Sequence, residues 1–375
     1  MAASPSVGPS SRAGWQRTPD EPAFRDSALG SVIWTGSRFL ATAWTGDSLL
    51  LDSLDGRAWN RQPPFEITPW STGPHLVAAG PGRLVAFGGG SNGPLTAWLS
   101  SDGLAWTEVP DQDAFHATDG AFQELSAVIA SDDGWVAVGR EFHNCQPRCP
   151  LRAVVLVSDD GRRWTRLAQQ PALRDAEMFG IARGPSGLIA VGSVMVDPAR
   201  GEAGLRAAAW TSSDGRAWTL APPSTFAMPA RLSLTGPTDV VLRAVAARGD
   251  RLVILGDARP TFGSDTEYVA PLAIAWWSDG AAWTPVTIGP FYDTAEVKLA
   301  VVPAGYLAIT GSDADCASAL WASADGSAWR CGGTDLDVDR AVVTGAAASP
   351  DLEVLVGRSL TDPDGAAAVW TLALR

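Results

Sequence analysis

The three histidines of this chain could bind a divalent metal or act as general bases near neutral pH. They are His75, His116 and His143, and Glu141 stands close to the last of them. Imidazoles with a carboxylate are a ligand set that zinc accepts. Their long spacing matches no metal motif, and no partner nucleophile is evident, so exposed loop histidines are the default interpretation. A metal site at these histidines is the minor alternative, and no cofactor is expected.

Arginines and a tyrosine add candidates for ligand contact. Arg174 and Arg231 could hold an anionic group with two hydrogen bonds each, although ordinary solvated arginines are the better interpretation. Tyr292 lies beside Asp293 and near Glu296, the nearest approach in the chain to a tyrosine–acid nucleophile pair. We assign no catalytic residue. The candidate ligand-binding set is His75, His116, Glu141, His143, Arg174, Arg231 and Tyr292.

A repeated motif identifies the scaffold that must position these residues. The pattern Ser-x-Asp-Gly-x-x-Trp occurs six times with variations, ending at Trp59, Trp106, Trp164, Trp218, Trp283 and Trp329. Asp-Gly between two apolar runs is a strong hairpin signal, because glycine accepts positive φ and aspartate bonds locally to the turn. Further short runs rich in Val, Ile, Leu and Trp precede each copy, bounded by glycine and proline. Four strands in each unit of about 45 to 65 residues predict the blades of an all-β propeller.

The blade count follows from both ends of the chain. After Trp329, apolar runs at 341–344, 353–357 and 368–371 supply three strands of a further blade. The segment at Trp15 reads as the missing fourth strand. We therefore predict a seven-bladed β-propeller of four-stranded antiparallel blades, closed by an N-terminal strand at Trp15, which removes free sheet edges. Residues 1–14 are expected to be a flexible tail and 15–375 a single propeller. Tryptophans that recur in register are predicted core residues: Trp98, Trp210, Trp276, Trp321 and Trp370.

The repeated motif resembles the Asp-box, or BNR repeat, of sialidase-like β-propellers, from residue 15 onward. Each copy is one residue shorter between Asp and Trp than the usual box, and the fifth has lost a further residue. The resemblance implies a structural role in peripheral turns for Asp55, Asp102, Asp160, Asp214, Asp279 and Asp325. Sialidase chemistry would need an arginine triad, a Tyr–Glu pair and an acid on six blades. The chain shows no complete set and predicts seven blades.

Strand direction sorts the connections between two faces of the predicted ring. The Asp-Gly turns and the first-to-second-strand turns share one face, called here the short-turn face. The second-to-third-strand and blade-to-blade connections share the other, the long-loop face, where binding residues usually lie. The long segments are 61–75, 110–124, 140–152, 193–206, 222–241, 257–271 and 287–296. Aromatic residues in them could stack on a sugar or anchor a protein, or could instead cap the packing of the blades: Trp70, Phe115, Phe122, Phe226, Phe262 and Phe291.

Four cysteines bear on the compartment. Cys316 and Cys331 flank a predicted hairpin and can face each other across it, which leaves Cys145 with Cys149 as the other disulfide. Two disulfides favour a secreted or cell-envelope protein whose signal or anchor is not present in this chain. Four unpaired thiols in a cytoplasmic protein are the alternative.

Charge limits the partners. The net charge is −13 and the only lysine is Lys298, so no basic run could follow a phosphate backbone, and nucleic acid is not expected. The apolar runs are far shorter than the ~20 residues of a membrane span. We expect a monomer that binds a glycan or protein on its long-loop face. The preferred function is an exported, non-catalytic, ligand-binding propeller. The alternative is a glycan-active hydrolase of the sialidase-like superfamily that uses loop carboxylates.

Overall fold

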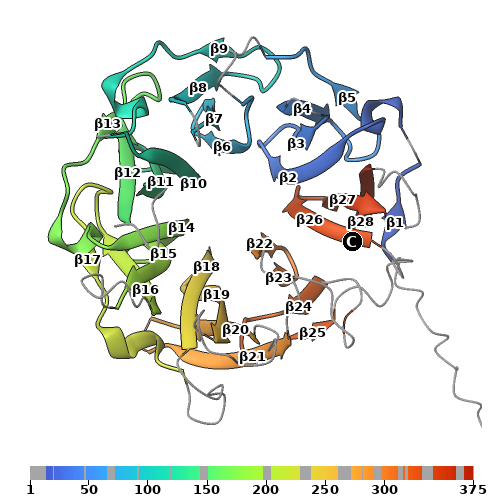
Figure 1. Ribbon diagram of the computed structural model, residues 1–375. Coiled ribbons are helices and arrows are strands. Elements are labelled where there is room, and N and C mark those ends of the chain that lie inside the picture. The colour runs from blue at the N-terminus through green and yellow to red at the C-terminus, as the bar shows by residue number, and fades with distance from the viewer. Residues whose placement is uncertain are drawn as a thin grey trace, which may run out of the picture.

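Seven four-stranded antiparallel sheets form a closed ring in the computed structural model of this chain (Figure 1). Each sheet is one blade, and blades 1 to 7 follow the chain. This confirms the predicted seven-bladed all-β propeller. The structure describes residues 14–19, 21–45, 48–65, 72–90, 93–118, 120–143, 151–196, 204–228, 238–260, 272–280, 282–290, 297–310, 316, 320–331, 341–359 and 367–374.

The first strand of each blade lies nearest the centre of the ring, and the second follows outward (Figure 1). The first strands are β2 (Ala28–Trp34), β6 (Leu76–Gly80), β10 (Phe122–Ser131), β14 (Ala176–Gly184), β18 (Thr238–Arg248), β22 (Lys298–Val302) and β26 (Ala341–Ala348). The second strands are β3 (Phe39–Trp44), β7 (Arg83–Gly89), β11 (Gly134–Phe142), β15 (Gly187–Met195), β19 (Arg251–Pro260), β23 (Gly305–Ile309) and β27 (Leu352–Ser359).

The third strands are β4 (Ser48–Ser53), β8 (Leu95–Ser100), β12 (Arg152–Ser158), β16 (Leu205–Ser212), β20 (Leu272–Ser278), β24 (Leu320–Ser323) and β28 (Ala367–Ala373). The outermost strands are mostly two residues long: β5 (Asn60–Arg61), β9 (Thr107–Glu108), β13 (Thr165–Arg166), β17 (Thr219–Leu220), β21 (Thr284–Pro290), β25 (Arg330–Cys331) and β1 (Gln16–Arg17). Short 3-10 helices follow four of them: η1 (Pro22–Phe24), η2 (Asp113–Phe115), η3 (Pro171–Leu173) and η4 (Pro223–Phe226). Several strands extend into segments predicted as loops.

The N-terminal strand closes the ring as predicted. Gln16 pairs with Thr371 and Arg17 with Trp370, so β1 supplies the outer strand of blade 7. The amide of Thr18 donates to the carbonyl of Val369 at 2.8 Å and extends the pairing by one bond. Because blade 7 takes strands from both termini, its pairing holds the two ends of the propeller together.

The cores lie within and between the blades. The five predicted strand tryptophans are all buried, with Trp210 and Trp276 almost completely so. In five first strands the register shifts near the middle, which inserts an extra residue there, as Phe179 does in β14 and Arg243 in β18. Such bulges re-aim a side chain without breaking the sheet. They matter here because both residues belong to the candidate site.

The repeated Asp-Gly turns are held by their own side chains. Oδ1 of Asp214 accepts hydrogen bonds from the amides of Arg216 (2.8 Å) and Ala217 (3.0 Å). These amides, Ala217 first, keep the pKa of Asp214 below its ordinary value. Gly215 has φ 74°, and a Cβ there would lie 2.6 Å from Val136 of blade 3, so only glycine fits this seam. The same acceptor role is described for Asp55, Asp102, Asp160 and Asp325.

Each 3-10 helix inserts one apolar side chain into the seam before the next blade. Phe24, Phe115, Leu173 and Phe226 are all at most 4% exposed there. For Phe115 and Phe226, packing is therefore the role that the structure shows, in place of an exposed contact for a sugar. We call these residues seam plugs. Trp70, Phe262 and Phe291 lie outside the described residues.

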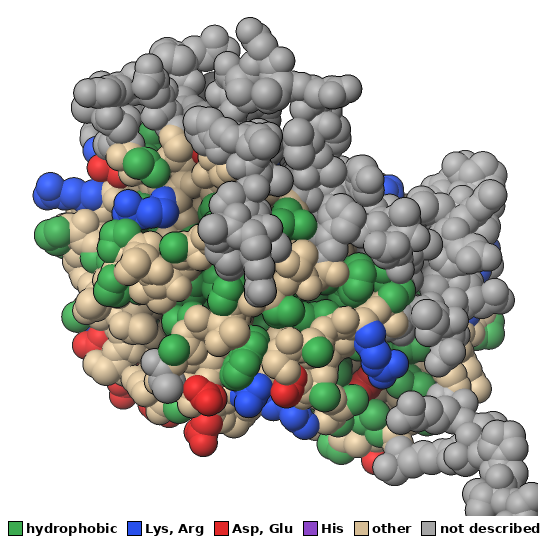
Figure 2. Space-filling model, turned by 90° about the horizontal axis from the view of Figure 1, so that it is seen from below, with side chains coloured by type: hydrophobic (Ala, Val, Ile, Leu, Met, Phe, Trp, Pro, Cys, Tyr) green, Lys and Arg blue, Asp and Glu red, His purple; other side chains and the backbone are tan. Residues whose placement is uncertain are grey.

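Cys316 and Cys331 form the predicted disulfide, with a Cα–Cα distance of 5.4 Å. The pairing of Cys145 with Cys149 lies outside the described residues. Within the part of the chain that the structure describes, no helix has the length and apolar character needed to cross a membrane. In the view of Figure 2, Asp and Glu side chains lie mostly along the lower edge, and Lys and Arg side chains lie both there and at the upper left.

Candidate functional site

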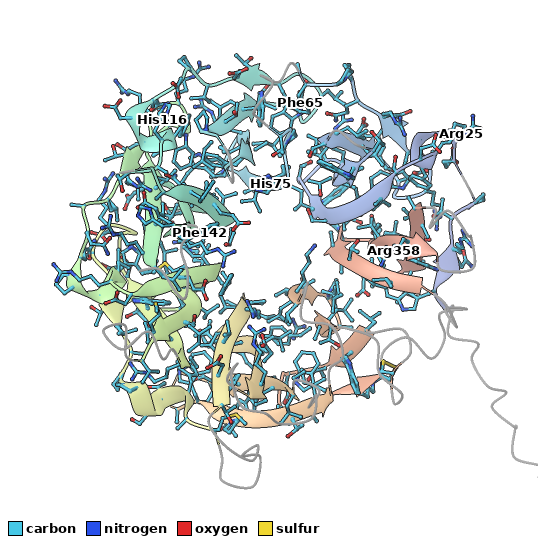
Figure 3. The ribbon with its side chains drawn as sticks, viewed as in Figure 1. Arg25, Phe65, His75, His116, Phe142 and Arg358 are labelled. Carbon is cyan, nitrogen blue, oxygen red and sulfur yellow. A yellow bond between two sulfur atoms is a disulfide. The ribbon has the colours of Figure 1, made fainter. Side chains whose placement is uncertain are left out.

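A cluster of aromatic and charged side chains lies at the inner rim of blades 3 to 5, toward the long-loop face. It is built from the beginnings of the first strands and the ends of the second strands, which meet on that face. We call it the inner-rim cluster: Phe122, Glu124, Arg140, Phe142, Glu177, Phe179, Arg243 and Asp257. Figure 3 labels Phe142 within it, near the centre of the ring.

Arg140 joins blades 3 and 4. Its Nε and Nη2 donate to Oε2 of Glu124 at 3.0 and 2.9 Å, and its Nη1 donates to Oε2 of Glu177 at 3.0 Å. Ser193 donates to the other oxygen of Glu177 at 2.8 Å. Partial burial lowers the pKa of Arg140, but the two carboxylates outweigh it and the net pKa is raised. The guanidinium thus stays charged while it bridges the two acidic side chains.

Three phenyl rings surround these charges. Phe122 and Phe142 stack with ring centroids 5.6 Å apart and an interplanar angle of 30°. The guanidinium carbon of Arg140 lies 5.0 Å from the centroid of Phe142 and 5.8 Å from that of Phe179. All three rings are partly exposed. Aromatic faces beside arginines form a surface that can stack on a flat ligand and donate hydrogen bonds to it.

Arg243 continues the cluster into blade 5. Its guanidinium carbon lies 4.7 Å from the centroid of Phe179, so this ring sits between two arginines. Nε of Arg243 donates to Oδ1 of Asp257 at 2.6 Å, and Arg259 approaches Oδ2 at 3.6 Å. Asp257 is completely buried, which fixes the direction of Arg243. No described residue accepts a hydrogen bond from Nη1 or Nη2 of Arg243, so these donors can face a ligand.

His75 and Lys298 occupy other parts of the inner rim (His75 is labelled in Figure 3). Partial burial lowers the pKa of His75, against an opposing effect of Glu124 and a backbone hydrogen bond with Leu125. His75 is therefore neutral at pH 7 and can accept as well as donate. Lys298 in blade 6 donates from Nζ to the carbonyl of Gly30 in blade 1 at 2.7 Å, which spans the inner edge of blade 7.

The other predicted site residues are scattered. His116 lies at the outer side of the ring, where Nε2 contacts Asp111 at 2.9 Å (Figure 3). Glu141 is buried and accepts from Thr118 Oγ1 at 2.7 Å, with Arg166 at 3.6 Å. Arg174 is exposed and His143 partly exposed. Arg231 and Tyr292 lie outside the described residues.

The predicted histidines are not brought together. His75 is at the inner rim and His116 at the outer side of the ring, so they cannot share a metal (Figure 3). Among the residues that the structure describes, no three His, Cys, Asp or Glu side chains are grouped as metal ligands would be. Their separate roles as ligand contacts stay predictions.

Comparison with known proteins places the fold and no more. No protein-family description and no curated protein matches the sequence. The structure resembles an ulvan lyase of polysaccharide lyase family PL25 bound to -[GlcA(1-4)Rha3S]-, with a TM-score of 0.54, 13% identity, and coverage of 93% of this chain and 95% of that one. It resembles the β-propeller domain of the Trilobed protease from Pyrococcus furiosus (TM-score 0.52, 9% identity, 92% and 93% covered). It also resembles the GH74 xyloglucanase from Xanthomonas campestris (0.50, 18%, 88% and 51%).

Most of the inner-rim cluster was missed by sequence reasoning, which searched the loops. Glu124 and Arg140 fall in the segments predicted as long loops but were not singled out there, whereas Phe179 lies inside a strand, where alternation predicts a core. A signal was present, however. Gly139-Arg140-Glu141 and Gly256-Asp257 place charged residues directly after the glycine that ends an apolar run. Charges at the same point of the blade 3 and blade 5 repeats indicate one shared surface.

Proposed function

We propose that this protein is an exported, non-catalytic β-propeller that binds a glycan at the inner-rim cluster of its long-loop face. The observation that carries the proposal is Phe179 held between Arg140 and Arg243 at 5.8 and 4.7 Å, beside the stacked pair Phe122–Phe142. Partly exposed rings supply faces for the C–H side of a sugar, and the unused Nη atoms of Arg243 supply donors for its oxygens.

The hydrogen bonding and burial of the rim carboxylates favour ligand binding without catalysis. A glycosidase of the common kind needs one carboxylic acid that carries a proton and one carboxylate. Glu124 and Glu177 both accept hydrogen bonds from the same guanidinium, and the other oxygen of Glu177 accepts from Ser193. Asp257 is completely buried and bound to Arg243. None of these acids is arranged as a proton donor.

Three further observations support the proposal. Two of the structural neighbours are named for action on polysaccharides, which is consistent with a glycan ligand. The Cys316–Cys331 disulfide is typical of an oxidising compartment and supports export. The serine, aspartate and glycine bonding of the short turns supports the interpretation of the repeats as shortened Asp-boxes.

A glycan array on purified protein tests the proposal, with Arg243→Gln as the informative variant. Arg251 on the short-turn face is its matched control, since it also stacks on an aromatic ring (Trp277, 4.7 Å) and contacts an aspartate (Asp325, 3.4 Å). We expect wild-type protein and Arg251→Gln to bind the same glycans and Arg243→Gln to lose them. Equal binding by all three proteins would place the site elsewhere.

A glycan-active enzyme is the second candidate, and one observation favours it: Glu124 and Glu177 converge on Arg140 at the inner rim. Fluorogenic glycosides and a polysaccharide-lyase absorbance assay test it. Turnover that disappears in Glu124→Gln would establish this candidate in place of the non-catalytic one. Turnover unchanged in that variant would point to a contaminating enzyme.

A further inference from the structure

The seam before blade 2 is filled differently from those that hold a seam plug. Phe65 lies in it and contacts Trp98 and Trp106, with ring centroids 5.2 and 6.1 Å away from its own. Phe226 makes the same pair of contacts with Trp276 and Trp283, at 6.1 and 5.3 Å. Whereas Phe226 is 3% exposed, Phe65 is only partly buried. The seam before blade 2 is therefore open. The four seams that hold a plug on a 3-10 helix are sealed.

The tryptophan of the repeated motif also changes its partner in this blade. In blades 1, 3, 4 and 6, the indole N–H donates to the carbonyl of the glycine in its own turn: Trp59, Trp164, Trp218 and Trp329. Trp106 instead donates to Oε1 of Gln62, at 3.2 Å. Nε2 of Gln62 donates to the carbonyl of Gly103, the glycine of the same turn. Both polar groups of Gln62 are thus engaged, and the indole of Trp106 is fixed in its altered position.

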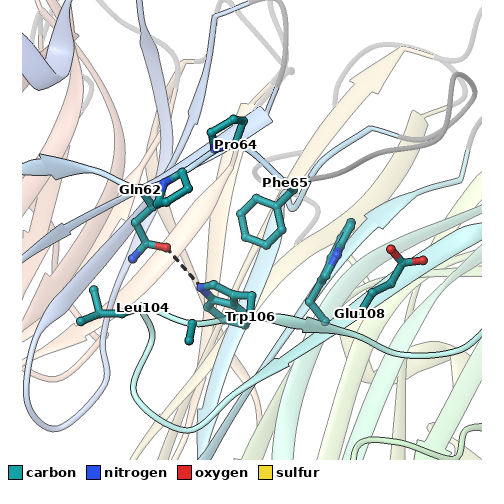
Figure 4. A pocket seen from close by; sticks show the side chains of 9 residues that line it. Gln62, Pro64, Phe65, Leu104, Trp106 and Glu108 are labelled. Carbon is teal, nitrogen blue, oxygen red and sulfur yellow. Dashed lines mark hydrogen bonds between the residues drawn. The ribbon is translucent and has the colours of Figure 1, made fainter.

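These two departures border a pocket of about 400 Å³ on the outer side of the ring, between blades 1 and 2 (Figure 4). Its wall combines Phe65 and Trp106 with Pro63, Pro64 and Leu104. Glu108 is exposed at its edge and no described residue pairs with it. The volume falls in the range of small-ligand sites.

We infer that this outer pocket binds a single sugar ring as a second glycan contact. The C–H face of a pyranose would stack on Phe65 and Trp106, and the Glu108 carboxylate would accept hydrogen bonds from its hydroxyl groups. The choice of a sugar, over another ring of similar size, rests on the proposed glycan function. The pocket itself is independent of the inner-rim cluster, since it lies on the outer side of another pair of blades.

The structure offers a matched variant for the test. The plug position is filled by leucine in the seam before blade 4, where Leu173 is 2% exposed. Phe65→Leu therefore keeps an apolar plug that this fold accepts and removes the flat face. Leu173→Phe is the control for the reverse change in a sealed seam. Trp106→Phe identifies the indole resonance of Trp106 by its loss from the spectrum.

The measurement is the ¹H–¹⁵N spectrum of the indole groups during titration with methyl glycosides of glucose, galactose, xylose and rhamnose. We expect at least one glycoside to shift the Trp106 resonance, with binding about three- to tenfold weaker in Phe65→Leu and unchanged in Leu173→Phe. Glu108→Gln should weaken binding as well. A Trp106 resonance that no glycoside moves, or that moves equally in Phe65→Leu, overturns the inference. A parallel titration with a proline-rich peptide would also overturn it if the peptide alone, and no glycoside, shifts this resonance.

The same titration in Arg243→Gln separates the two proposals. The outer pocket predicts that the Trp106 shift persists in this variant even if array binding is lost. If array binding survives in Arg243→Gln but depends on Phe65, the inner-rim proposal fails and the outer pocket stands. If the Trp106 shift vanishes in Arg243→Gln, the outer pocket is not an independent site and the inference is wrong.

Discussion

Gln170, which follows the outermost strand of blade 3, accepts a hydrogen bond at 3.0 Å from the backbone amide of Trp218 in blade 4. Its Nε2 also donates to the carbonyl of Arg216 at 2.6 Å. Gln112 binds the turn of Trp164 in the same way, through the Trp164 amide and the Arg162 carbonyl. A side-chain amide can satisfy one donor and one acceptor of a turn together. These glutamines therefore latch neighbouring blades across the seam.

Gln170→Ala should lower the free energy of unfolding by about 1–2 kcal/mol, because one partly buried and one exposed hydrogen bond between blades are lost. Urea denaturation followed by tryptophan fluorescence measures the change. The neighbouring exposed residue Gln169 is the control, and Gln169→Ala should leave stability nearly unchanged. Equal midpoints for the two variants would show that the latch does not stabilise the seam.

Asp214→Ala should destabilise the protein in a manner that depends on pH. The folded pKa of Asp214 is lowered from 3.8, so its stabilising effect is present above that value and is lost as pH falls through the folded pKa. We expect a lower Tm than wild type at pH 7 and a smaller difference in acid. Ser213, exposed in the same turn, supplies the control Ser213→Ala. A Tm difference that stays constant down to acid pH would contradict the role of the ionised carboxylate.

Glu353 should be a destabilising residue at neutral pH. The second residue of the second strand is apolar or aromatic in the six other blades: Leu40, Leu84, Trp135, Leu188, Leu252 and Tyr306. In blade 7 it is Glu353, which is 3% exposed and has an Oε1 without a described partner. Burial raises its pKa, against an opposing backbone hydrogen bond from Ala304.

Glu353→Leu should therefore raise the free energy of unfolding by about 1–3 kcal/mol at pH 7. A folded pKa above the unfolded value means that wild-type stability rises as pH falls from the folded to the unfolded pKa, so the advantage of the variant should shrink over that interval. Thermal unfolding from pH 4 to 8 measures both effects. Asp351→Asn, at the exposed turn nearby, is the control. A destabilised Glu353→Leu would show that the carboxylate has a stabilising partner.

Removing the Cys316–Cys331 disulfide should cost about 3 kcal/mol, the chain-entropy expectation for its 15-residue separation. The paired variant Cys316→Ala/Cys331→Ala, compared with wild type with and without reductant, measures this by chemical denaturation. Non-reducing peptide mapping of the wild type should recover the linked peptides. Finding both thiols free in secreted protein would remove one support for export.

The fold was largely predictable because the repeat is carried by backbone requirements. Gly215 and its equivalents must adopt positive φ, and the strand tryptophans recur in register with them, so the blade count and the closing strand at Trp15 follow from spacing. The disulfide between Cys316 and Cys331 follows from the same hairpin. Local chemistry repeated along a chain is what sequence patterns report best.

The site was less predictable because it depends on pairings between blades. Arg140 contacts Glu177 in the next blade and shares Phe179 with Arg243 from the blade after that, so no local pattern contains the cluster. The packing role of Phe115 and Phe226 was predicted only as one of two alternatives, since both lie in short proline- or aspartate-led segments that read as exposed loops. Their distance from tryptophans was available: Phe115 and Leu173 each follow a motif tryptophan by nine residues, and Phe24 follows Trp15 by nine.

The most direct test of the proposed function is calorimetric titration of the best array glycan into wild-type protein and Phe179→Leu, with the recovered glycan then checked for intactness by mass spectrometry. Binding by Phe179 between Arg140 and Arg243 predicts a saturable wild-type isotherm, binding at least about threefold weaker in Phe179→Leu, and an unaltered glycan. Equal affinity of the two proteins, or a cleaved glycan, would contradict the account.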